Sequence, residues 1–272
     1  MDNGGATFGG VSFASLGLLL TKAHIPLLPE TVQTEEELDG LDGLVDVETK
    51  YGPRLIELEV SLITEDETEY QIALQRIAKI FNARAGIKPL VLDRMTGKQW
   101  LCKYNGRIPI EKVGSIGEFT LPFKTFFPFS ESVTDSVTQL EYGQGYSYGM
   151  GLQYAGLATF NVTSSPTDLT VNHAGTHEAY PLIRLVGSGT NIIITNTTTG
   201  ESLSINQVMS ASDVLEIDCR PLEQMVRKNG ISSFNGVLGT FPRLVEGVNI
   251  ITITATGAKL TVSFVFRHTY LY

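Results

Sequence analysis

A Gly-x-Ser-x-Gly pattern is the segment that most resembles a catalytic motif. Residues 145–149 read Gly-Tyr-Ser-Tyr-Gly, the pattern of a nucleophile elbow, in which a tight strand-to-helix turn exposes the serine oxygen beside backbone amides. No apolar strand leads into this segment, and more glycines follow it in place of a helix. We therefore interpret it as a flexible linker. A hydrolase built on Ser147 stays an alternative, which an esterase assay on a Ser147→Ala variant would test.

Two histidines four residues apart, His173 and His177, have a spacing that metal sites use. On a helix this spacing would direct both imidazoles at one metal ion, with Glu178 beside them. The glycine between them and the strand-like surroundings predict a loop instead, so we interpret both as polar loop residues. His24 and His268 have no partners near them in the sequence. The sequence thus predicts no catalytic residue, no metal ligand and no cofactor.

Carboxylates occur in contiguous runs and not in the separated pairs of general acid–base sites. Glu35–Glu37 is followed by Asp39 and Asp42, and a second run covers Glu65–Glu67. Such runs are typical of solvated loops or of helix N-termini, where negative charge is favourable. The sequence also contains no phosphate-binding loop, no Gly-x-Gly-x-x-Gly pattern and no Cys-x-x-Cys pair. We therefore expect the protein not to be an enzyme.

Four tyrosines could form a stacking platform for a sugar ring, because an aromatic face suits the apolar side of a pyranose. They are Tyr142, Tyr146, Tyr148 and Tyr154. Aromatic packing within or between subunits would explain the same residues. A carbohydrate-binding adhesion module is accordingly the second function class, and loss of glycan binding on Tyr→Ala substitution would favour it.

Composition excludes several further classes. The 272 residues carry a net charge of −9, and both halves are acidic, so a surface that wraps duplex DNA is not expected. No apolar run approaches the roughly 18 residues of a membrane span, and no basic segment precedes Leu16–Leu20 as in a signal peptide. Two cysteines, Cys102 and Cys219, predict buried thiols in a reducing compartment. We expect a soluble protein, without membrane insertion, that is made in a cytoplasm.

The first half predicts strands around a single helix. Apolar residues recur at three- and four-residue steps from Thr68 to about Ala85, with Thr68 and Gln71 as a capping box and Gly86 after the helix end. Alternation predicts a strand at Leu55–Ile63. Further expected strands are Pro89–Asp93 and Gln99–Tyr104, joined by a turn at Thr96-Gly97, then Arg107–Lys112 and Gly117–Lys124.

The second half predicts only strands. Residues 127–156 lose all periodicity, which places a domain boundary near Ser132 and gives domains 1–132 and 133–272. A turn is expected at Asn196–Glu201. The spacing of the strands favours a β-sandwich or jelly roll: Leu157–Thr163, Tyr180–Val186, Asn191–Thr195, Ser202–Asn206, Val214–Asp218, Asn249–Thr254 and Leu260–Arg267. The fold class is therefore mainly β (α+β).

Lys22–Thr49 is a long segment with two prolines, many carboxylates and little periodicity. Segments of this kind are usually functional or ordered by a partner. Our hypothesis is an arm that embraces an adjacent subunit or faces a central channel. A structure with this segment packed wholly on its own domain would refute the hypothesis.

The order of short motifs resembles the phage distal tail protein family (Dit, the siphophage tail-component family) over nearly the whole chain. The motifs of the first half are Gly10–Leu18, Pro26 to Glu30, Leu38–Gly43, Tyr51-Gly-x-Arg54, Phe119–Phe123 and Phe127–Phe129. Those of the second half are Asn172–Thr176, Ala179–Pro181, Asn196–Gly200, Asp213–Asp218, Asn229-Gly230, Phe241–Leu244, Glu246–Asn249 and Arg267–Tyr270. Glu246 is a departure, because proline is expected there.

The resemblance implies a structural virion protein. It implies an N-terminal, β-sandwich-like domain with one helix that builds a homohexameric ring at the distal end of a tail tube, and a C-terminal galectin-like jelly roll. The partners it implies are the tail tube protein and the tail-associated lysin, tail-tip or receptor-binding proteins of the baseplate. Genomic DNA would pass through the lumen without specific binding, and an acidic wall would repel its phosphates. Assembly in the bacterial cytoplasm is expected, with the virion tail as the final location.

Overall fold

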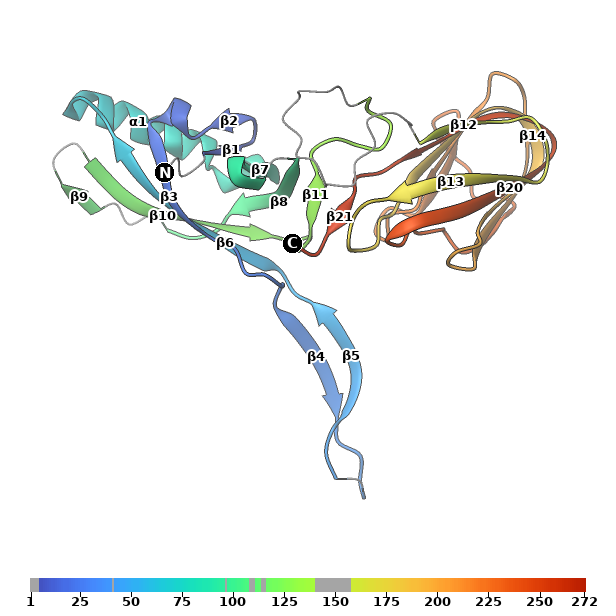
Figure 1. Cartoon of the computed structure of the whole chain (residues 1–272), viewed down its shortest axis with the longest axis horizontal. Coiled ribbons are helices and arrows are strands. Elements are labelled where there is room, and N and C mark those ends of the chain that lie inside the picture. Colours follow the sequence, from blue (N-terminus) through green and yellow to red (C-terminus); the bar gives the residue numbers. More distant parts are fainter. Residues whose placement is uncertain (1–4, 41, 96, 108–110, 114–115, 140–157) are drawn as a thin grey trace. The chain divides into compact units, whose positions relative to one another are not determined.

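The computed structural model describes residues 5–40, 42–95, 97–107, 111–113, 116–139 and 158–272 (Figure 1). The chain divides into two compact units. The first comprises Met1–Glu131 together with Leu271–Tyr272, and the second comprises Ser132–Tyr270. Each unit has its own core of buried apolar side chains. The fold is mainly β with one α-helix, as the sequence predicts.

The first unit contains an antiparallel sheet whose strands follow the order β2-β1-β7-β8-β10-β6-β3, with β9 beside β10 and β11 beside β8. Hydrogen bonds join these strands in one continuous sheet, beside the single helix that the sequence predicts for this domain. The strands are β1 (Ala6–Phe8), β2 (Val11–Ser12), β3 (Leu18–His24), β6 (Arg54–Ile63), β7 (Lys88–Leu92), β8 (Lys98–Tyr104), β9 (Glu111–Val113), β10 (Ile116–Thr125) and β11 (Ser130–Ser132).

Helix α1 (Glu67–Ile80) covers the inner face of this sheet through the predicted apolar stripe. Tyr70, Ile77 and Phe81 are buried with the sheet residues of the same core. The predicted ends are wrong. The side chain of Asp66 caps the helix by accepting the Glu69 amide at 2.8 Å, so the Thr68–Gln71 capping box does not form at this end. Asp66, two residues before Thr68, is the N-cap in its place and accepts one free amide of the first turn.

The C-terminal end of α1 also differs from the prediction. The helix stops at Ile80, and a separate 3₁₀ turn, η2 (Ala83–Ala85), precedes Gly86. Asn82 explains the break, because its side chain accepts the Arg84 amide at 3.0 Å and starts the new turn. Two further 3₁₀ turns are η1 (Ala14–Leu16) and η3 (Asp93–Met95).

Among the strands that the structure describes, β4 (Thr31–Glu36) and β5 (Val45–Tyr51) pair only with each other, in a two-stranded antiparallel hairpin. They extend away from the strands around β6 (Figure 1). The segment Lys22–Thr49 is therefore more ordered than predicted: its first residues belong to β3, and most of the rest forms this hairpin.

The second unit is a sandwich built on two long bent strands, β14 (Leu182–Asn196) and β20 (Gly247–Val265). The first half of β14 pairs with the second half of β20; β16 pairs with this part of β14, and β12 with this part of β20. The second half of β14 pairs with the first half of β20; here β15 pairs with β14, and β13 with β20. Inward side chains of both groups form one core. The remaining strands are β12 (Thr159–Val162), β13 (Thr167–His173), β15 (Glu201–Met209), β16 (Val214–Asp218), β17 (Met225–Lys228), β18 (Ile231–Ser232), β19 (Val237–Gly239) and β21 (Thr269–Tyr270).

Two pairs of predicted strands are in fact single strands. Most of Tyr180–Val186 and all of Asn191–Thr195 belong to β14, which begins at Leu182. All of Asn249–Thr254 and most of Leu260–Arg267 belong to β20, which ends at Val265. Glycines interrupt both runs in the sequence, but they mark bends and register shifts within a continuous strand and not its end. The turn at Asn196–Glu201 and strand β16 agree with the prediction.

Both cysteines are free and buried, as predicted. Burial raises the pKa of the Cys102 thiol to about 12 and also raises the pKa of Cys219. Within the described residues, no helix is long and apolar enough to cross a membrane.

Candidate functional site

The serine motif and the four tyrosines of the sequence analysis lie outside the described residues. Ser147, Tyr142, Tyr146, Tyr148 and Tyr154 all fall within residues 140–157. Among the residues that the structure does describe, no group of three His, Cys, Asp or Glu side chains has metal-binding geometry.

The prediction that His173 is a polar loop residue is wrong. His173 ends strand β13, is fully buried, and stacks on His268 with ring centroids 5.5 Å apart. Its Nε2 lies 2.6 Å from the carbonyl oxygen of His177, the residue with which a metal site was considered. His268 therefore has a clustered partner after all, from a segment 95 residues away, and sequence spacing contains no signal for it.

His24 also has a partner that the sequence does not reveal. Its Nε2 lies 2.9 Å from Glu59 of strand β6, and the same carboxylate forms an ion pair with Lys22 at 3.1 Å. These hydrogen bonds hold the pKa of Glu59 below its usual range. The group is exposed and lies on the outer face of the β3–β6 pair.

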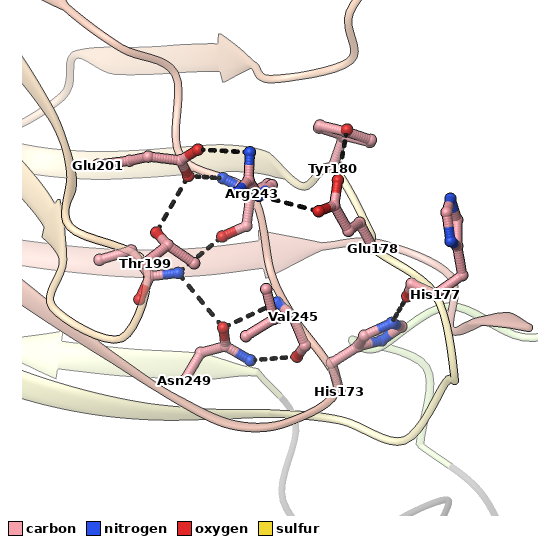
Figure 2. Close-up of polar contacts among 10 residues, drawn as sticks. His173, His177, Glu178, Tyr180, Thr199, Glu201, Arg243, Val245 and Asn249 are labelled. Carbon is pink, nitrogen blue, oxygen red and sulfur yellow. Dashed lines mark hydrogen bonds and ion pairs between the residues drawn. The ribbon is translucent and has the colours of Figure 1, made fainter. Parts of the chain in front are cut away.

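A polar network in the second unit connects several of the sequence motifs (Figure 2). Arg243 forms ion pairs with Glu178 at 3.2 Å and with Glu201 at 3.1 Å. Tyr180 donates its hydroxyl to Glu178 at 2.9 Å. Burial, followed by this carboxylate, raises the pKa of the Tyr180 hydroxyl to about 12. The charged side chains are paired with one another, so the network holds the loop before β20 in place.

Two buried asparagines complete this network. Asn249 accepts the Val245 amide at 3.0 Å and donates to the carbonyls of Val245 and Gly247 at 2.8 and 3.2 Å. Asn196 donates to the carbonyl of Arg243 at 2.7 Å. Motif residues such as these therefore have structural roles in holding turns, and none of them forms a reactive centre.

The β4–β5 hairpin is the surface that stands out as a candidate for binding. Every residue of both strands is exposed. Residues 30–51 contain eight carboxylates and one lysine, Lys50, which pairs with Glu48 on its own strand at 2.7 Å. Glu35 is the register partner of Asp46, so two like charges face each other across the hairpin. A two-stranded hairpin gains little stability from its own contacts, and facing carboxylates weaken it further, so this exposed segment is a candidate for binding.

The root of the hairpin, in contrast, is anchored on the first unit. Gly52 donates its amide to the Glu30 carbonyl at 2.7 Å, which closes the last pair of the ladder. Tyr51 packs edge-on against Phe129 with ring centroids 5.7 Å apart. Arg54, the first residue of the following strand β6, is fully buried, and burial lowers the pKa of its guanidinium. The hairpin thus extends from a fixed base.

Comparison with known proteins agrees with this architecture. Residues 14–125 match the phage tail protein RIFT-related domain, and residues 174–270 match the siphovirus-type tail component, C-terminal domain. The chain belongs to the siphophage distal tail protein family. It is a structural component of a phage tail, and the two matched domains fall within the two compact units.

One solved structure shows the same fold along nearly the whole chain. The crystal structure of the SPP1 Dit protein, described as a paradigm of the hub adsorption apparatus in phages that infect Gram-positive bacteria, superposes with a TM-score of 0.73 at 15% identity. The match covers 97% of this chain and 98% of that chain. A chain of the phage p2 baseplate in its activated conformation with Sr matches at 9% identity, with a TM-score of 0.47 over 95% and 97% of the two chains. No curated protein matches the sequence significantly.

Proposed function

We propose that this distal tail protein forms a homohexameric ring at the distal end of a tail tube and acts as the hub that joins the tube to the baseplate. The tube protein would bind one side of the ring, and the tail-associated lysin, tail-tip or receptor-binding proteins the other. The description of the SPP1 relative as part of a hub adsorption apparatus supports this role. Assembly would take place in the cytoplasm of the bacterial host.

The observation that carries the proposal is the β4–β5 hairpin, which contributes no residue to the core of its own unit. Tyr51 at the root packs against Phe129, but every residue of both strands is exposed, so the hairpin is not packed wholly on its own domain and the arm hypothesis is not refuted. A closed ring requires heterologous contacts between unlike surfaces, and an exposed arm that reaches a neighbouring copy supplies such a contact.

The acidic charge of the chain suits a DNA passage. A wall of negative charge repels phosphates, so the genome would slide through the lumen without binding. Mapping the charges on the inner wall of an assembled ring tests this part of the proposal, and a basic wall would contradict it.

Native mass spectrometry of the full chain, with negative-stain imaging, tests the ring. The expected result is a six-fold ring with a central hole, formed by the protein alone or after addition of its tube or tip partner. A chain that stays monomeric with both partners would refute the ring. Glycan binding by such a monomer would support the adhesion module instead.

A further inference from the structure

Two lysines face each other on the sheet of the first unit without a carboxylate between them. Lys103 of β8 and Lys124 of β10 are direct register partners. The ammonium group of each lies 5.8 Å from the ring centroid of Phe126, which is 57% exposed. Within the described part of the chain, neither lysine forms an ion pair. Since like charges directly opposite each other destabilise a sheet, this arrangement calls for an anionic partner.

Leu55 extends the same surface. It is the register partner of Lys124 on the other side of β10 and is 52% exposed. Its neighbour Ile56 is buried in the core, so Leu55 and Lys124 lie on the outer face, which α1 does not cover. We call Leu55, Lys103, Lys124 and Phe126 the lysine–phenylalanine patch. It combines two cations with exposed aromatic and aliphatic surface.

The hairpin has the complementary chemistry. Glu35 and Asp46 face each other across it. Val32 and Val45 are an odd number of residues from this pair along their strands and lie on the other face of the hairpin. The acidic face of the hairpin therefore matches the two cations of the patch. The two surfaces would also relieve each other's like-charge repulsion.

We propose that the lysine–phenylalanine patch receives the β4–β5 hairpin of a second copy of this chain. The contact is intermolecular, because Leu55 lies three residues beyond Gly52 at the root of the hairpin, whereas the Glu35–Asp46 pair lies about 15 Å out along the strands. A hairpin would have to fold back on itself to reach its own patch. This assignment rests on the proposed ring and identifies the surface that would receive each arm.

Cross-linking of the full chain tests the contact. A Glu35→Cys/Lys124→Cys double variant, treated with a short bis-maleimide, is expected to give a ladder of covalent oligomers on a denaturing gel. The native thiols do not compete, because both are buried. The two single-cysteine variants are the matched controls and should give no ladder. A cross-linked monomer would show that the hairpin folds onto its own patch and would overturn the proposal.

The cross-link also separates this proposal from the ring itself. Rings seen by native mass spectrometry without any cross-link would overturn the patch assignment and leave the proposed function intact. Absence of rings from the unmodified protein with its partners would overturn both.

Charge reversal supplies an independent test. Lys103→Glu/Lys124→Glu is expected to weaken ring assembly at least tenfold without changing the thermal melting curve, and a second pair of changes, Glu35→Lys/Asp46→Lys, should restore it. Reversal of two exposed helix cations, Arg76→Glu/Lys79→Glu, is the control and should leave assembly unchanged. Normal assembly of the patch variant, or failure of the compensating pair to restore rings in a folded protein, would overturn the proposal.

Discussion

The imidazole rings of His173 and His268 stack in the second unit with their Nδ1 atoms 3.3 Å apart. The amide of Ala174 donates to the Nδ1 of His268 at 3.1 Å, so this nitrogen is an acceptor and carries no proton. Burial, and then the adjacent His173, lowers the pKa of His268 from 6.5 to about 4. Burial lowers the pKa of His173 as well, against the opposing effects of its hydrogen bond to the His177 backbone and of the charge of Glu246.

This pair predicts that the second unit loses stability in weak acid. A buried histidine with a lowered pKa stays neutral in the folded state, whereas the unfolded chain takes up the proton near pH 6.5. Above pH 6.5 the histidine is neutral in both states and protonation takes nothing from the stability. As the pH falls from 6.5 to about 4, protonation of the unfolded chain lowers the free energy of unfolding, by about 3 kcal/mol in total for His268. The free energy of unfolding, measured by denaturant titration at several pH values, should fall over this range.

A His268→Asn variant separates this effect from the carboxylates, since an asparagine oxygen can still accept the Ala174 amide. The variant should show a flatter dependence of stability on pH between 6.5 and 4. An unchanged slope would mean that the two Nδ1 atoms already share a proton in the folded protein at neutral pH.

A second prediction concerns the bend of β14. Gly187 has φ of +128°, and a Cβ at this position would lie 2.1 Å from the carbonyl oxygen of Lys259 on β20. Gly187→Ala is therefore expected to lower the free energy of unfolding by at least ~2–3 kcal/mol. Gly230 is the control: its φ is +80°, but a Cβ would meet open space, so Gly230→Ala should cost only about 1 kcal/mol. Equal losses of melting temperature in the Gly187→Ala and Gly230→Ala variants would show that the contact between residue 187 and the Lys259 carbonyl leaves room for a Cβ atom.

These bends also explain how far the fold could be predicted from sequence. Periodicity located α1, β6 and the β7–β8 pair, because their apolar residues all face one core. It divided β14 at Gly187–Gly189, because local sequence cannot distinguish a glycine that ends a strand from one that bends it. The partner strand β20, about 70 residues away, decides the outcome at Gly187.

The candidate site could be predicted only in part. Charge and the lack of periodicity singled out Lys22–Thr49, but not its hairpin pairing, since its strands have no buried face to produce alternation. The facing lysines Lys103 and Lys124 could not be recognised, because their register depends on the order β8-β10 in the finished sheet. The contact between His173 and His268 could not be predicted either, because the two residues are 95 positions apart in the sequence.

A third prediction concerns Asn249 in the network before β20. The side chain is fully buried, and Asn249→Ala would leave the amide of Val245 and the side chain of Asn196 without this acceptor. The expected loss is about 2–4 kcal/mol, because buried groups left unpaired bear their full desolvation penalty. Calorimetry of the variant measures it.

Arg243→Met is the matched comparison for this prediction. The Arg243 side chain is 40% exposed, and the substitution keeps the backbone contacts of residue 243, so its loss should stay below about 1 kcal/mol. A larger loss for Arg243→Met than for Asn249→Ala would mean that the ion pairs, and not the buried amides, hold the loop.

The last prediction removes the hairpin. Replacing residues 32–50 by Asn-Gly joins Thr31 to Tyr51, which are register partners, through a turn that suits a two-residue hairpin. Because no residue of β4 or β5 belongs to the core, the free energy of unfolding of the monomer should change by less than about 0.5 kcal/mol. Ring assembly should nevertheless be lost, since the arm is the surface that we expect to contact the neighbouring copy. A large drop in melting temperature would instead indicate that the hairpin covers apolar surface of its own unit. Exposed side chains such as Leu19 and Ile63 on the outer face would then be the first candidates for that surface.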